Sequence, residues 1–140
     1  MPPLWQGSVL AVISVGGALG ACARRAADVL WPTAADGFPW ATFGVNAVGC
    51  ALMGAFMVLA TEVRRPHRLV RPFVGTGVLG GFTTFSTYAV GVQRLTERDH
   101  VGLATAYLAA TPVTAVACVW GATVLTRWAA SRAGGQGPSA

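Results

Sequence analysis

The sequence has no lysine and only five acidic residues among its 140 positions. Charged residues make up 11% of the chain and hydrophobic residues 54%, whereas a soluble domain carries roughly a quarter charged residues. The mean hydropathy is +0.55. This scarcity of charge excludes an ordinary soluble domain and indicates one small membrane domain.

Titratable side chains are also missing from the long apolar runs. No Asp, Glu, Lys or His lies in the core of any run, and both His67 and His100 fall between runs. A proton-coupled transporter normally places a titratable group within a span, and an enzyme needs a nucleophile with a base or a metal cluster. We therefore expect a protein that is not an enzyme and that moves its solute passively.

Cysteine and net charge exclude two further classes. Cys22, Cys50 and Cys118 are isolated in apolar runs, and an odd count without C-x-x-C spacing argues against a disulfide framework or a zinc site. We expect them to be buried apolar fillers. The net charge of +5 comes from arginines between the runs, which is typical of membrane topology and not of nucleic-acid binding.

Charged clusters divide the chain into four apolar runs, each long enough for a membrane-spanning helix of roughly 20 residues. The predicted spans cover residues 4–23, 40–60, 72–92 and 101–126. Residues 127–140, which are rich in glycine near their end, are predicted to form a flexible C-terminal tail. The fold class is therefore an all-α membrane protein with four transmembrane helices.

The third span contains a stretch that a lipid-facing helix disfavours. Two adjacent glycines loosen the helix, and four hydroxyl residues compete for its backbone hydrogen bonds. Backbone that leaves the helix at membrane depth must line a cavity or be buried in protein, as at ion and substrate sites. We predict that this helix is broken near its middle, at Gly80-Gly81-Phe82-Thr83-Thr84-Phe85-Ser86-Thr87-Tyr88.

The ten arginines are almost balanced between the two sides of a four-span protein. Both termini and the central loop share one side, with six arginines, and the other side has four. A clear excess of basic residues normally sets orientation, so this bias predicts insertion in both orientations and pairing with an inverted copy. The two sets are Arg64, Arg65, Arg68, Arg71, Arg127 and Arg132, against Arg24, Arg25, Arg94 and Arg98.

Small residues and one amide indicate how the spans pack. The pairs Gly16/Gly20 and Gly77/Gly81 have the spacing that allows close helix approach in membranes. Four short spans enclose no wide pore, so we expect a dimer. Asn46, the only asparagine, lies inside the second span and needs a partner there. An interhelical hydrogen bond and a donor facing a pore both remain open.

Aromatic and hydroxyl side chains supply further groups for an anion. Phe82, Phe85 and Tyr88 are spaced by three, so they are expected to share one helical face. The edges of aromatic rings are electropositive and suit an anion. Additional hydroxyl donors are Thr83, Thr84, Ser86, Thr87, Thr111 and Thr114.

Three motifs occur in order along the chain: Gly16-Gly17-Ala18-Leu19-Gly20-Ala21-Cys22-Ala23-Arg24, Thr42-Phe43-Gly44-Val45-Asn46-Ala47-Val48-Gly49 and Gly80-Gly81-Phe82-Thr83-Thr84-Phe85-Ser86-Thr87. Together they resemble the CrcB/Fluc family of fluoride channels, over the whole four-span region. The resemblance implies an antiparallel, dual-topology homodimer with two pores in the inner (plasma) membrane. It further implies passive export of cytoplasmic fluoride, which relieves fluoride toxicity.

The resemblance also assigns residues to the fluoride path. Asn46 matches the pore asparagine, and Phe85 matches the first of two phenylalanines whose ring edges face fluoride. Tyr88 stands where the second phenylalanine is usual, and its hydroxyl adds a donor at that position. Thr111 falls where the family carries a pore-lining serine, and Ser86 and Thr87 belong to the same hydroxyl-rich stretch.

Two further roles follow from the resemblance. Arg24 is expected near a pore vestibule, where its charge would attract anions. Gly80 and Thr83 match residues whose backbone carbonyls hold a structural Na⁺ between the subunits, and carbonyl oxygens suit such a hard cation. The implied partners are therefore fluoride, a second copy of the chain, a lipid bilayer and Na⁺.

Two other functions compete with a fluoride channel. A small dual-topology four-span exporter of cationic compounds would share the size, but it calls for a membrane-embedded acid and the spans contain none. A structural subunit of a larger membrane complex would use the glycines, Asn46 and the threonines only for helix packing. That role leaves the co-occurrence of the three motifs unexplained.

Overall fold

The computed structural model describes residues 3–34, 37–63 and 66–134, and every regular element in this part of the chain is helical. The three long helices are α1 (Pro3–Leu30), α2 (Trp40–Val58) and α5 (Val101–Gly134). A π-helical turn, η1 (Leu59–Val63), continues α2. The third span consists of the π-helix η2 (Arg71–Leu79), the short α3 (Gly80–Phe82) and α4 (Ser86–Glu97).

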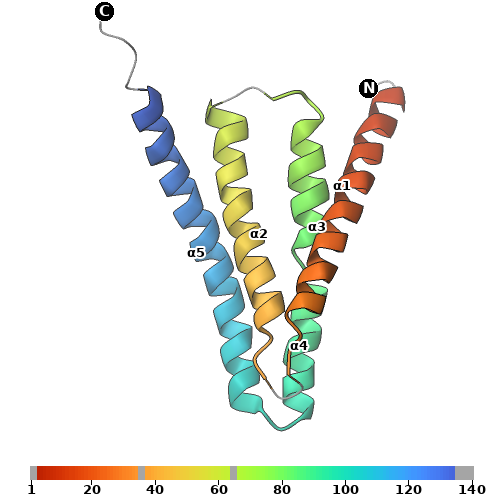
Figure 1. Ribbon diagram of the computed structural model, residues 1–140, viewed down its shortest axis with the longest axis vertical. Coiled ribbons are helices and arrows are strands. Elements are labelled where there is room, and N and C mark those ends of the chain that lie inside the picture. Colours follow the sequence, from red (N-terminus) through yellow and green to blue (C-terminus); the bar gives the residue numbers. More distant parts are fainter. Residues whose placement is uncertain (1–2, 35–36, 64–65, 135–140) are drawn as a thin grey trace, which may run out of the picture.

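The helices run side by side, and each successive span is antiparallel to the one before it (Figure 1). Both termini and the connection between η1 and η2 lie at one end, and the other two connections lie at the opposite end. Three continuous helices, Gln6–Leu30, Trp40–Val63 and Val101–Ala133, are long and apolar enough to cross a membrane. The remaining span is interrupted after α3, which confirms the predicted all-helical fold with a broken third helix.

The helices end later than the charge pattern predicted. α1 runs past the predicted end at residue 23 to Leu30, shortly before Pro32, because the position before a proline disfavours the helix. α5 continues from Arg127 to Gly134, since alanine and arginine are good helix formers. Residues 127–134 therefore belong to α5 and not to the predicted tail. Residues 135–140 of that tail, and Arg64 and Arg65 of the basic loop, lie outside the described residues.

Glycines bring α1 into direct backbone contact with the first half of the third span. A Cβ atom at Gly20 would overlap the carbonyl oxygen of Val78, and one at Gly81 would overlap that of Gly17. A Cβ at Gly16 would lie 2.5 Å from the carbonyl oxygen of Phe73. The predicted close helix approach at the two glycine pairs is therefore confirmed, and any side chain there would force the helices apart.

The buried core of a single chain is small and lies mainly between α4 and α5. Its main cluster consists of Tyr88, Leu95, Ala104 and Tyr107, and five further apolar residues are buried outside α4 and α5, namely Ala41, Val45, Val58, Ala60 and Leu79. Large apolar side chains cover the outside instead, as expected where lipid replaces the protein interior; Trp120, for example, is 70% exposed. The expectation of buried cysteines is wrong for Cys22, which is exposed because it lies on an outward face of α1; Cys50 and Cys118 are half-buried.

Candidate functional site

The third span leaves helical conformation at Thr83, which is extended, with φ −78° and ψ 154°. The chain becomes helical again at Ser86, where α4 begins. Side chains satisfy part of the backbone released by this break, as capping requires. The Thr87 amide donates to Thr84 Oγ1 at 3.1 Å, so Thr84 caps the start of α4. The break is therefore an ordered turn with specific partners.

Asn46 on α2 holds the middle of the break through both ends of its amide. Its Nδ2 donates to the Thr84 carbonyl at 2.9 Å, and its Oδ1 accepts from the Thr84 amide at 2.8 Å. The side chain is only 8% exposed. This pair of bonds supports the interhelical interpretation of Asn46. Because an amide nitrogen carries two hydrogens, one N–H is left over for a ligand, so the role as a pore donor stays a prediction.

Arg24 on α1 reaches both sides of the same break. Its Nε donates to the Gly81 carbonyl and its Nη1 to Thr87 Oγ1, each at 3.4 Å. The side chain is half-buried. Arg24 therefore joins α1 to α3 and α4, and it places a positive charge beside the hydroxyl residues of the break.

The hydroxyl residues predicted as donors form a connected group. Thr84 Oγ1 lies 3.1 Å from Thr87 Oγ1 and 3.3 Å from Ser86 Oγ. Ser86 is exposed and Thr87 is half-buried. Several hydroxyl groups in one short stretch offer a polar surface whose hydrogens rotate to suit a ligand.

The break also separates the three aromatic residues that the sequence placed on one face. Phe82 lies in α3 and packs beside Gly49 of α2. Phe85 and Tyr88 remain neighbours, with ring centroids 5.5 Å apart and planes inclined at 57°. The expectation of a single three-residue stripe is wrong, because two helices replace the continuous one. Phe85 is 79% exposed, while Tyr88 is buried and donates its hydroxyl to the Leu108 carbonyl at 2.8 Å.

A second group of donors lies between α2 and α5 and includes two residues that the sequence did not single out as site residues. Tyr107 is completely buried, and its neighbours Thr42 and Thr111 are almost so. Thr111 donates its hydroxyl to the Tyr107 carbonyl at 2.9 Å. The Tyr107 hydroxyl lies near those of Thr42 and Thr111 but makes no hydrogen bond with good geometry to any described residue. A buried hydroxyl without a well-aligned partner is costly, so this position suits a water molecule or another small polar ligand.

Helical spacing is the signal that would have found these residues. Tyr107 precedes Thr111 by four positions, and Thr42 precedes Asn46 by four. Residues four apart share a helix face. Each missed residue therefore extends a face that already carried a predicted site residue.

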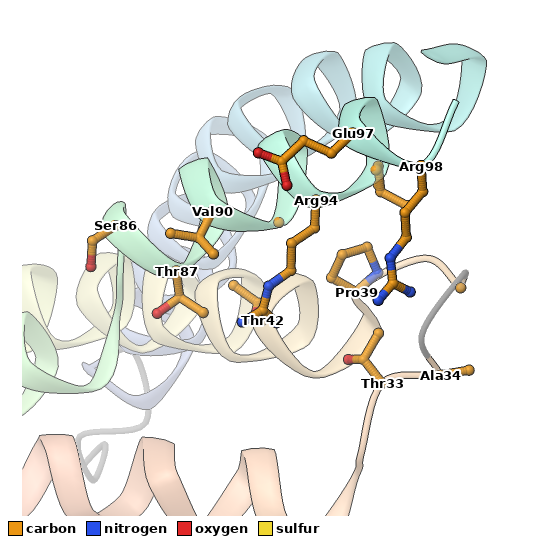
Figure 2. A pocket seen from close by; sticks show the side chains of 13 residues that line it. Thr33, Ala34, Pro39, Thr42, Ser86, Thr87, Val90, Arg94, Glu97 and Arg98 are labelled. Atoms are coloured by element: carbon orange, nitrogen blue, oxygen red, sulfur yellow. The ribbon is translucent and has the colours of Figure 1, made fainter. Parts of the chain in front are cut away.

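A cavity of about 500 Å³ opens at the end of the bundle opposite the termini. Figure 2 shows the Arg94 side chain extending from α4 toward Thr42, with Arg98 farther out beside Pro39. The lining residue Gly91 also packs against Tyr107, since a Cβ there would lie 3.0 Å from the Tyr107 ring. The lining residues include Thr42, Ser86, Thr87, Gly91, Arg94 and Arg98.

The charged residues that line the cavity do not include Arg24, whose place near a pore vestibule stays a prediction. Arg94 and Arg98 line it, together with one acid, Glu97, which also accepts a hydrogen bond from Gln93. Arg24 contacts the lining residue Thr87 but is not among the lining residues itself. The cavity thus carries a positive charge at its mouth and hydroxyl groups at its inner end.

No cluster of three or more His, Cys, Asp or Glu residues suited to a metal occurs in the described parts of the chain. The carbonyls of Gly80 and Thr83 could nevertheless bind a cation, because they lack their usual helical hydrogen-bond donors. In a continuous helix the Gly80 carbonyl would accept from the Thr84 amide, and the Thr83 carbonyl from the Thr87 amide. Those amides instead donate to Asn46 and to Thr84 Oγ1. Oxygen donors released in this manner fit a hard cation such as Na⁺.

Comparison with known proteins finds a family model described as CrcB-like protein, Camphor Resistance (CrcB), which matches residues 11–123. A fluoride-specific ion channel FluC 1 of Streptomyces coelicolor is 61% identical over 127 residues, which cover 91% of this chain and 80% of that protein. FluC 2 of Nocardia farcinica is 48% identical over 133 residues, covering 95% and 94%. FluC 1 of Mycobacterium tuberculosis is 42% identical over 118 residues, covering 84% and 89%.

Proposed function

The chain is a multi-pass membrane protein of the CrcB family, and we propose that it is a fluoride-selective passive channel. In this role it exports cytoplasmic fluoride and relieves fluoride toxicity. The observation that carries the proposal is the ordered break in the third span, where amide, hydroxyl and aromatic groups gather without an acid or a base that could couple transport to protons. The relatives named fluoride-specific ion channels support it.

The donor chemistry suits fluoride, a small anion that holds its water tightly. A selective path must replace that water with hydrogen-bond donors and still release the ion. From the cavity, the path would pass Thr42 and the Tyr107 hydroxyl, which has no well-aligned hydrogen bond among the described residues. It would continue past the remaining N–H of Asn46 and the ring edge of Phe85. Neutral donors bind the anion without the deep trap that a fully buried positive charge would create.

The proposed channel is an antiparallel homodimer in the inner (plasma) membrane. Phe85 is 79% exposed in a single chain, beside backbone that has left the helix. Such backbone at membrane depth must be covered by protein or line a cavity, so a second copy is the natural cover. The near balance of six arginines against four favours an inverted partner. A C-terminal tag should accordingly be found on both faces of the membrane.

A structural Na⁺ between the copies is part of the same proposal. The carbonyls of Gly80 and Thr83 would hold it, since their usual helical donors are engaged elsewhere. Bound there, the cation would supply a central charge that fixes the two breaks against each other. The chain's own contribution is to leave these carbonyls without their usual helical donors, because the Thr84 and Thr87 amides donate to Asn46 and to Thr84 Oγ1.

The two other functions are less well supported by the site. An exporter of cationic compounds would need a carboxylate at the break, and the break contains hydroxyl, amide and aromatic groups instead. A purely structural subunit gives no reason for a completely buried hydroxyl without a well-aligned partner in the part of the chain that the structure describes. Neither observation favours a second function over the channel.

Anion efflux from liposomes that contain the purified protein tests the proposal. We expect fast fluoride efflux and negligible chloride efflux, driven only by the gradient and balanced by a potassium ionophore. Empty liposomes provide the background, and cross-linking in detergent establishes that the protein is a dimer. Well-folded dimers that release no fluoride would refute the channel.

A further inference from the structure

Pro112 removes one hydrogen bond from the middle of α5. A proline has no backbone N–H, so the helical bond from position 112 to the Leu108 carbonyl is missing. The Tyr88 hydroxyl of α4 donates to this same carbonyl at 2.8 Å. The Leu108 carbonyl, which loses its helical donor because of Pro112, thus accepts the hydrogen bond of the Tyr88 hydroxyl.

We propose that Tyr88 and Pro112 form a coupled pair, in which the tyrosine hydroxyl replaces the helical hydrogen bond that the proline removes. Tyr88 is then a positioning residue for the ion path and does not use its hydroxyl as an anion donor. The part of this inference that concerns the path rests on the proposed function. The pairing itself rests only on the hydrogen bond and on the chemistry of proline.

The hydrogen bond from Tyr88 to Leu108 stabilises the fold because it lies where lipid offers the carbonyl no other donor. Lipid supplies no donor for a carbonyl that has lost its helical partner, and the Tyr88 side chain is only 8% exposed. Its ring lies between two aromatic neighbours, at 5.5 Å from Phe85 and 5.3 Å from Tyr107 between ring centroids. Fixing the hydroxyl to α5 therefore fixes the ring and, through it, both neighbours.

The two tyrosines of the chain consequently have opposite roles. A phenol has one hydrogen to donate, and Tyr88 has given its hydrogen to Leu108. Tyr107, in contact with it, is completely buried and has no acceptor with good geometry among the described residues. An anion that enters this region meets one available phenol and not two.

A double-mutant cycle with Tyr88→Phe and Pro112→Ala tests the pair. In the wild-type background, Tyr88→Phe should lower fluoride efflux about fivefold, the equivalent of one net hydrogen bond. In the Pro112→Ala background the same change should have little effect, because the introduced alanine amide can serve Leu108. Pro112→Ala alone should keep efflux close to wild type. Thermal unfolding in detergent should show the same coupling, with a lower Tm for Tyr88→Phe only when Pro112 is present.

Gly121→Ala provides a matched control for the proline substitution. It lies on the same helix, and its added methyl group meets open space. The effect of Tyr88→Phe should be the same with and without it, since independent sites add. A Tyr88→Phe protein that fails to fold alone but folds with Pro112→Ala would support the pair directly.

The outcomes separate this pair from the proposed function. Equal effects of Tyr88→Phe in both backgrounds, or no effect in either, overturn the pair even if the wild-type protein conducts fluoride. Equal losses of efflux without any change of Tm would identify the hydroxyl as an anion donor. Wild-type protein that conducts no fluoride, with clear coupling in Tm, refutes the channel and leaves the pair standing.

Discussion

The two halves of the broken third span are held in opposite ways. The first half, η2 and α3, meets α1 through backbone, because glycines leave no side chain in the seam. The second half, α4, packs on α5 through Tyr88 and Leu95 against Ala104 and Tyr107. The distance between α1 and the first half is therefore fixed by direct backbone contact. The second carries the aromatic and polar groups of the proposed path, where side chains can be tuned individually.

Gly20→Val should break the fixed half and have the largest effect of all. Even the first carbon of the new side chain would overlap the Val78 carbonyl oxygen, and backbone cannot move aside without separating α1 from η2. Overpacking a tight contact costs about 1–3 kcal/mol or more, so we expect little folded protein and no fluoride efflux. Size-exclusion chromatography and thermal unfolding in detergent measure this loss.

Gly7→Ala is the control for the glycine seam. It lies on the same helix, but an added Cβ there meets nothing within 4 Å. This variant should fold and unfold like the wild type. A stable, conducting Gly20→Val protein would show that the two helices do not need the contact.

Asn46→Asp should disrupt the contact between α2 and the break that joins the two halves. A carboxylate cannot donate to the Thr84 carbonyl, which Asn46 Nδ2 contacts at 2.9 Å, and its negative charge in a buried position repels an anion. We expect fluoride efflux to fall by at least about tenfold, since leaving the Thr84 carbonyl without its donor alone costs about 1–3 kcal/mol. Efflux per folded dimer is the measurement, and an unchanged rate would place Asn46 outside the path.

The sequence predicts those features that depend on a local pattern. The glycine pairs indicated close helix approach, and adjacent Gly80 and Gly81 before four hydroxyl residues indicated the break. The helix ends were less predictable, because charged residues such as Arg24 and Arg127 are good helix formers and do not stop a helix. Charge marks the membrane boundary, which is a different position.

The finer site depends on contacts between helices that no local pattern specifies. Tyr88 shows this best, since its hydroxyl was expected to be an extra donor and instead serves Leu108 on α5. The buried Tyr107 hydroxyl, which has no well-aligned hydrogen bond among the described residues, likewise lies beside Thr42 only because α2 packs on α5. The cavity at Arg94 requires the connection before α2 to fold against α4.

Arg94→Gln should have the smallest effect, because it changes a side chain of α4 without touching a packed contact. It therefore tests whether side chains of the second half can be changed individually. Arg94 is exposed and extends into the cavity toward Thr42 (Figure 2), so its charge would attract fluoride to the mouth. We expect efflux at low fluoride and low ionic strength to fall about two- to fivefold. The difference should fade in about 0.3 M salt, where screening acts over a few ångströms, and Arg94→Lys should retain most of the rate.

Arg25→Gln removes the same charge from an exposed site in α1 that does not line the cavity. An equal loss from both substitutions would mean that overall charge, and not the cavity, attracts the anion.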